Sequence, residues 1–146
     1  MQSKQKPILI KGGTHTDQRG RLDFINTFSL SNIKRMYMTT QYDINVVRAW
    51  QGHKIESRWF FCVQGHFTVK LIPIDNWENP SEDLQAMTFE LDEGIPQVLY
   101  IPKGYANGFK ATKKRSKLMI FADYDLNEIE NDAVRYNQNK WVSWGS

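Results

Sequence analysis

The residues best suited to chemistry in this chain gather between positions 48 and 58. His53 carries an imidazole, the side chain that most readily accepts and returns protons near neutral pH. Arg48 and Arg58 lie on either side of it and can stabilise a negatively charged oxygen or bind a phosphate. Gln51 stands two residues before His53 and can form hydrogen bonds, but it cannot accept a proton. This stretch therefore predicts a pocket that moves protons beside an anionic group.

The same stretch has the spacing of a metal site in which some ligands are replaced. Metal-binding cupins carry His-x-His followed by Glu and Gly, and later Pro-x-Gly-x-x-His. The similar segments here are Gln51-x-His53 with Glu56 and Gly65, and Pro102-x-Gly104-x-x-Asn107. Carboxamides thus occupy two of the four ligand positions, and their neutral oxygens bind transition metals weakly compared with imidazole or carboxylate. We expect no metal and no other cofactor, and we expect side chains alone to do the chemistry.

Short apolar runs separated by turn residues must position these side chains. Residues 21–28 alternate apolar and polar side chains, as a half-buried strand does. Residues 58–74 predict two strands joined at Gln64-Gly65, with Phe67, Val69 and Leu71 on one face. Further strands are predicted over residues 33–40, 45–50, 86–91, 97–102 and 117–124.

The number and spacing of these runs predict an all-β fold, a cupin-type jelly roll of two antiparallel sheets. Helical spacing is confined to residues 125–136, where we expect a short C-terminal helix or turn. No linker or repeat divides residues 1–146, which indicates a single cupin domain. Aromatic strand faces and exposed sheet edges favour a homodimer.

Composition argues against several other partners. No run approaches the roughly 18 apolar residues of a membrane span, and the N-terminus lacks a secretory signal. The single Cys62 cannot form an internal disulfide, so we expect a cytoplasmic protein without a membrane partner. The formal net charge is only +3, and the basic run at residues 113–117 is too small for a nucleic-acid footprint.

Four stretches, taken in order, carry a family resemblance. They are HTDQRGRLDF, IKRMYMTTQYDINVVRAWQGHK, LYIPKGYANGF and FADYDLNEIENDAVRY. They are similar to motifs of the nucleotide-diphospho-4-keto-6-deoxysugar epimerases and 3,4-ketoisomerases, the dTDP-4-dehydrorhamnose 3,5-epimerase-like and WxcM-like cupins. The resemblance implies an isomerase that abstracts a proton next to the ketone of a nucleotide-diphospho-sugar, in deoxysugar and surface-polysaccharide biosynthesis. The chain length favours the ketoisomerase branch.

The resemblance also suggests a role for each candidate residue. His53 is the expected base, Tyr37 the expected proton shuttle and Tyr124 a second candidate acid. Tyr37 alternates with two methionines and therefore points to the opposite face of its strand. The expected substrate-binding residues are Arg48, Gln51, Lys54, Arg58, Arg19 and Asn107. Arg48 and Arg58 are suited to the enolate oxygen or the diphosphate, and Arg19 matches the arginine that reaches the nucleotide in that family.

One departure from the family bears on which of its branches the chain resembles. The 3,5-epimerases carry their base at the first His of the motif, and this chain has Gln51 there. A 3,5-epimerase that works through this position is therefore not expected, whereas a ketoisomerase remains possible because His53 fills the second position. Two alternatives stay open. One is a 3- or 5-epimerase of the same substrates with His53 as base; the other is a non-catalytic sugar-nucleotide-binding cupin.

Overall fold

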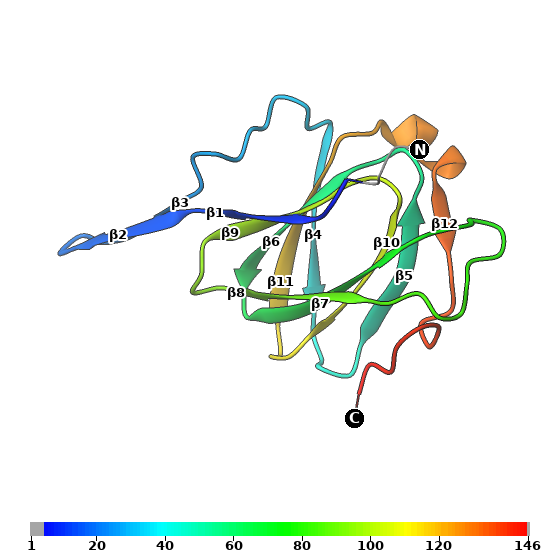
Figure 1. The fold of residues 1–146 in the computed structure, drawn as a ribbon. Coiled ribbons are helices and arrows are strands. Elements are labelled where there is room, and N and C mark those ends of the chain that lie inside the picture. Colours follow the sequence, from blue (N-terminus) through cyan, green and yellow to red (C-terminus); the bar gives the residue numbers. More distant parts are fainter. Residues whose placement is uncertain (1–4, 146) are drawn as a thin grey trace.

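Two five-stranded antiparallel sheets face each other, and a two-stranded hairpin extends from one side of them (Figure 1). The computed structural model describes residues 5–145, and for residues 129 and 130 it describes the backbone alone. The architecture is the predicted jelly roll. Within the described residues, no helix is long and apolar enough to span a membrane.

The strands alternate between the sheets along the chain, so that neighbours in sequence often lie in different sheets. The first sheet has the order β1 (Ile8–Lys11), β9 (Gln97–Ile101), β6 (Arg58–Gln64), β11 (Ser116–Ala122) and β4 (Arg35–Gln41). The second has the order β12 (Ala133–Arg135), β5 (Val47–His53), β10 (Tyr105–Ala111), β7 (His66–Pro73) and β8 (Met87–Asp92). The hairpin consists of β2 (Gly13–Asp17) and β3 (Gly20–Phe24).

The core lies between the two sheets and follows the predicted alternation. Phe67, Val69 and Leu71 are fully buried on the inner face of β7. They belong to one apolar cluster with Phe60 of β6 and Leu118 of β11 in the opposite sheet. Burial of side chains of this size stabilises the fold by about 1.5–3 kcal/mol each. The same packing fixes the spacing between the strands that carry the candidate site.

The predicted joint between β6 and β7 is confirmed at Gly65. Its φ is +79°, a left-handed conformation that glycine adopts without steric cost. A Cβ at this position would lie 2.0 Å from Ser116 Oγ, so no side chain fits there. The tight turn sends the chain from the first sheet directly into the second.

The C-terminal tryptophans cover the outer face of the second sheet. Trp50 of β5 is 1% exposed. Its ring centroid lies 5.6 Å from that of Trp141 and 5.4 Å from that of Trp144. Its indole N–H donates to the carbonyl of Lys140 at 2.9 Å. The C-terminal segment therefore fixes β5, the strand that carries the central motif.

One sequence prediction about secondary structure needs correction, and another is confirmed. The strand expected over residues 21–28 ends at Phe24, and all of β3 is exposed because the hairpin projects away from both sheets (Figure 1). The expected short C-terminal helix or turn is confirmed as a 3-10 helix, η1 (Leu126–Asn131), and β12 begins after it at Ala133. Pairing of β12 with β5 outweighs the helical spacing there, since each sheet edge offers unpaired backbone groups.

Candidate functional site

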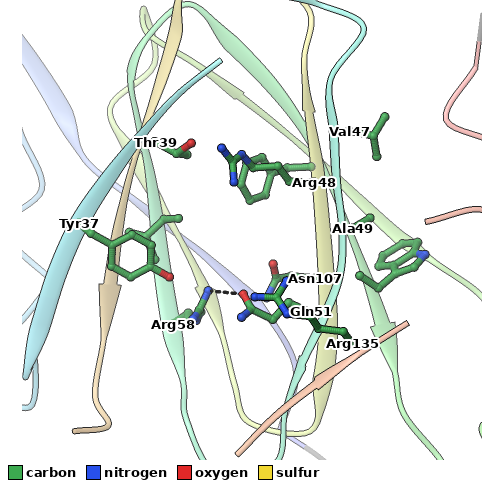
Figure 2. Close-up of a pocket in the computed structure, with 12 residues that line it drawn as sticks. Tyr37, Thr39, Val47, Arg48, Ala49, Gln51, Arg58, Asn107 and Arg135 are labelled. Carbon is green, nitrogen blue, oxygen red and sulfur yellow. Dashed lines mark hydrogen bonds between the residues drawn. The ribbon is translucent and has the colours of Figure 1, made fainter. Parts of the chain in front are cut away.

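A cavity of about 440 Å³ lies between the two sheets (Figure 2). Its lining comes from β4, β5, β6, β10, β11 and β12 and consists of Tyr37, Thr39, Val47, Arg48, Ala49, Trp50, Gln51, Arg58, Asn107, Phe109, Ile120 and Arg135. Both sheets contribute, and so does the C-terminal strand. The cavity therefore depends on contacts between segments that are distant in the sequence.

Positive charge dominates the cavity wall. The guanidinium groups of Arg48, Arg58 and Arg135 all line it, whereas no described Asp or Glu does. In Figure 2 these three side chains come from different strands; Arg58 and Arg135 lie beside Gln51, and Arg48 lies near Thr39. Arginine recognises carboxylate and phosphate groups through paired, charge-assisted hydrogen bonds. The wall is therefore suited to an anionic ligand.

Arg58 is held by a buried carboxylate behind the wall. Glu56 is 1% exposed, and its Oε2 accepts a hydrogen bond from Arg58 Nε at 2.6 Å. Its other oxygen, Oε1, accepts from Arg35 Nη2. Arg58 Nη1 donates to Gln51 Oε1 at 3.1 Å, which joins this network to the cavity (Figure 2). Glu56 thus partly compensates the charge of Arg58, and the guanidinium group of Arg58 is oriented toward Gln51.

Tyr37 is the titratable hydroxyl of the cavity. Its ring centroid lies 5.8 Å from Arg35 Cζ and 5.6 Å from Arg58 Cζ. Partial burial raises the pKa of the phenol, Arg58 and Arg35 oppose that shift, and Glu56 adds to it. Tyr37 is therefore protonated at neutral pH and can donate a proton to a ligand oxygen. The alternation predicted only that Tyr37 faces away from Met36 and Met38; in the structure it lines the cavity while the two methionines are exposed.

His53 and Asp132 form a buried pair at the end of β5. His53 is 2% exposed, and its Nδ1 lies 2.8 Å from Asp132 Oδ2. Burial lowers the pKa of the imidazole, and the hydrogen bond with Asp132 opposes that shift. Among the described residues, the Nε2 of His53 is a buried polar atom without a hydrogen-bond partner. A neutral ring whose Nδ1–H faces the carboxylate fits both observations and has a free lone pair on Nε2.

This pair and the neighbouring Glu56 have the chemistry of metal ligands. Ligand atoms of His53, Glu56 and Asp132 all lie within 4.8 Å of one another. Both oxygens of Glu56, however, already bind guanidinium groups. Asp132 accepts from the backbone N–H of Ile55 and, at 3.3 Å, from that of Glu56. Two arginines beside the cluster also repel a divalent cation. The carboxylate donors are therefore engaged within the protein and do not fit a metal, and metal-free chemistry remains our prediction.

The structure brings together five of the nine residues predicted from the sequence. Those that line the cavity are Tyr37, Arg48, Gln51, Arg58 and Asn107. Arg48 Nε donates to Gln41 Oε1 at 3.0 Å, so the partner of this cation is a neutral amide. Asn107 is 3% exposed and pairs with Gln51 across β10 and β5.

The other four predicted residues do not line the cavity. His53 lies behind the wall, two residues beyond Gln51 on β5. Lys54 is exposed. The side chain of Tyr124 is half-buried, and the backbone carbonyl of Tyr124 accepts a hydrogen bond from Arg35 at 2.9 Å. Arg19 lies on the projecting hairpin, ion-paired with Asp17 at 2.6 Å (Figure 1).

Two candidate site residues were missed in the sequence. Asp132 pairs with His53 across 79 positions of sequence, and no local pattern indicates such a contact. Arg135 lines the cavity from β12, a strand that the helical spacing of residues 125–136 concealed. The similarity of that segment to the late family motif was the one signal that could have drawn attention to it.

Comparisons with known proteins agree on one family. The family model FdtA, described as WxcM-like, C-terminal, matches residues 5–141. No curated protein matches. A mutant of the 3,4-ketoisomerase QdtA from Thermoanaerobacterium thermosaccharolyticum, in complex with TDP-4-keto-6-deoxyglucose, superposes with a TM-score of 0.68 at 25% identity, covering 89% of this chain and 87% of that one.

Two further structures support the fold. The WlaRB TDP-quinovose 3,4-ketoisomerase from Campylobacter jejuni gives a TM-score of 0.66 at 20% identity, covering 91% of this chain and 95% of that one. The rmlC epimerase from Mycobacterium tuberculosis gives a TM-score of 0.77 at 16% identity, covering 99% and 78%. Isomerases and epimerases of this kind thus share the fold, and the comparison does not separate the two activities.

Proposed function

Because the chain belongs to the family of WxcM-like C-terminal domains, we propose that it is a metal-free isomerase of a nucleotide-linked 4-keto-6-deoxysugar. The reaction is of the dTDP-sugar 3,4-ketoisomerase type and serves deoxysugar or surface-polysaccharide biosynthesis in the cytoplasm. The substrate lies in the cavity between the sheets, and no cofactor takes part.

The observation that carries this proposal is the charge of the cavity wall. Three guanidinium groups line it, those of Arg48, Arg58 and Arg135, and no carboxylate of the described residues does. A nucleotide-diphospho-sugar brings a diphosphate for such a wall and a neutral sugar for hydrogen-bonding groups. Gln51, Asn107 and Tyr37 supply those groups in the same cavity. Binding of an uncharged sugar alone would leave Arg48 and Arg135 without a negatively charged partner, at a cost in free energy.

The proposed reaction exchanges protons without exchanging electrons with another molecule. The 4-keto group acidifies the C3–H bond, so a base removes that proton and leaves an enolate. The C4 oxygen gains a proton to give an enediol, which then loses its O3 proton while C4 gains one. The product is the 3-keto sugar. Guanidinium groups beside the enolate oxygen lower the barrier by stabilising its negative charge.

We assign the base to His53 and the proton shuttle to Tyr37. A neutral imidazole bound at Nδ1 by Asp132, with a free lone pair at Nε2, has the tautomer that a general base needs. His53 follows Gln51 by two residues on β5 and lies outside the cavity lining, so the proposed reaction requires its ring to become accessible when the sugar binds. Tyr37 lies across the cavity and protonates the ketone oxygen (Figure 2).

A second function has its own supporting observation. Apart from Tyr37 and the arginines, no described titratable side chain lines the cavity. Gln51 also stands at the first-His position of the family motif. A sugar-nucleotide-binding protein without catalysis would have this composition. A 3- or 5-epimerase with His53 as base uses the same cavity and differs in where the proton returns.

Solvent exchange separates these functions. The protein is incubated with dTDP-4-keto-6-deoxyglucose in deuterated water, and the sugar is followed by NMR. We expect deuterium at ring carbon beside the ketone together with a new 3-keto product. Exchange at C3 or C5 with inverted configuration would identify an epimerase. Tight binding without exchange would identify the non-catalytic function, and absence of binding would overturn the proposal.

We also propose a homodimer, supported by two exposed features. The edge strand β4 presents Met36 and Met38 at 63% and 46% exposure. Arg19 lies on the projecting hairpin, so it contributes to a cavity only if that cavity belongs to a second copy (Figure 1). A stable dimer of this kind buries well over about 1,000 Å². A monomer at all concentrations in light scattering would contradict it.

A further inference from the structure

The three cavity arginines differ in how far the protein compensates their charge. Arg58 donates to the carboxylate of Glu56 at 2.6 Å. Arg48 donates to the amide oxygen of Gln41 at 3.0 Å, which leaves its charge uncompensated. Arg135 has neither an ion pair nor a side-chain hydrogen bond to any described residue. The cavity therefore presents two uncompensated positive charges, and Arg135 offers all five of its N–H donors.

The backbone beneath Arg135 is held firmly although its side chain is free. β12 pairs with β5, and Arg135 lies in register with Gln51. The next residue, Tyr136, exchanges two backbone hydrogen bonds with Trp50, each of 3.1 Å, and its hydroxyl donates to the carbonyl of Trp77 at 2.6 Å. Asp132, just before the strand, is fixed by His53. The backbone position from which the Arg135 side chain extends is thus fixed.

Arg135 also lies where a hydrated anion can reach it. The residue is exposed yet lines the cavity, which puts its side chain at the cavity mouth. In Figure 2 it extends from β12 toward Gln51 and Arg58. The ionised phosphates are the most strongly hydrated part of a nucleotide-diphospho-sugar, so their binding is least costly at the mouth. The sugar then extends inward, toward Gln51 and Tyr37.

From this charge distribution we infer that Arg135 binds the diphosphate of the substrate. The inference rests on the proposed function, because it takes the ligand to be a nucleotide-diphospho-sugar. Arg135 and Arg48 together supply two positive charges for the two ionised phosphates, while Arg58 remains bound to Glu56 and available to the sugar. The C-terminal strand β12 then has a role in recognition beyond closing the sheet.

The test compares binding of dTDP and thymidine to the wild-type protein and to Arg135→Gln by calorimetry. Loss of charge-assisted hydrogen bonds should weaken dTDP binding by about 10- to 100-fold. Thymidine binding should not change, since it carries no phosphate. The salt dependence of dTDP binding should become shallower in Arg135→Gln, because one fewer ion pair forms. The dTDP affinity of Arg135→Lys should lie between those of the wild type and Arg135→Gln, since lysine keeps the charge and loses the bidentate hydrogen bonding of the guanidinium group.

The matched control is Arg115→Gln, which removes an exposed arginine that does not line the cavity. It should bind dTDP like the wild type. Equal dTDP affinity in Arg135→Gln and the wild type would overturn the inference while leaving the proposed function intact. A wild-type protein that binds neither dTDP nor dTDP-4-keto-6-deoxyglucose would overturn the proposed function and this inference together. A parallel loss of thymidine affinity would show that Arg135 acts on the pocket shape instead of the diphosphate.

Discussion

Glu56→Gln is the substitution for which the structure makes its most specific prediction about stability. Both carboxylate oxygens of Glu56 bind guanidinium groups, Oε1 that of Arg35 and Oε2 that of Arg58. The side chain of Glu56 is fully buried, and those of Arg35 and Arg58 are 17% and 5% exposed. Replacing the carboxylate by an amide leaves two cations with little solvent and no counter-charge.

The magnitude follows from this geometry. Removal of one partner of a buried ion pair costs about 3–5 kcal/mol. The amide oxygen of Gln still accepts one hydrogen bond, so we expect the lower end, about 3 kcal/mol. For a chain of this size, each kcal/mol lowers the melting temperature by about 2–4 °C. Glu56→Gln should therefore melt about 6–12 °C below the wild type.

The assay is thermal unfolding followed by circular dichroism, at low and high salt. The difference between Glu56→Gln and the wild type should persist at high salt, because buried charges are screened little. The control is Glu90→Gln, whose carboxylate is 53% exposed and lies 3.4 Å from His66 Nε2. An exposed pair contributes about 0–1 kcal/mol, so this variant should melt close to the wild type. A Glu56→Gln protein that melts within about 2 °C of the wild type would refute the reasoning.

The remaining predictions concern catalysis, pH and metal. His53→Asn should keep nucleotide binding and lower solvent exchange by about 10²–10⁴-fold, while Gln51→Ala should mainly raise KM, measured by NMR and steady-state kinetics. Tyr37→Phe should slow exchange less than His53→Asn and leave dTDP affinity unchanged. Full exchange activity in His53→Asn would show that another residue is the base. Burial lowers the pKa of His53 from its ordinary 6.5, so the unfolded chain binds more protons than the folded one near that pH. The wild type should therefore lose stability as pH falls below about 6.5. His53→Asn should lose less stability over the same pH range, measured by chemical denaturation. Chelators should change neither melting nor activity, and one tightly bound transition metal per chain by elemental analysis would contradict the metal-free site.

Local pattern determined much of the scaffold. The alternation of Phe67, Val69 and Leu71 predicted a buried face, because successive side chains of a strand point to opposite sides. The same rule placed Tyr37 opposite Met36 and Met38. The cupin-like spacing of Gln51 and Asn107 also brought both residues to one cavity, since strand pairs joined by short turns conserve register. These features depend on neighbours in sequence, so the sequence by itself predicts them.

Other features depend on contacts that no local pattern encodes. The hairpin strand β3 has the alternation of a half-buried strand, yet it is exposed because neither sheet of its own chain lies against it. His53 has the sequence context of a cavity residue, but the carboxylate of Asp132 holds it behind the wall. Arg135 reaches the cavity because β12 pairs with β5, a contact across more than half of the chain. Burial and charge compensation are properties of the assembled sheets, and only the tertiary structure decides which of the candidate side chains a ligand can meet.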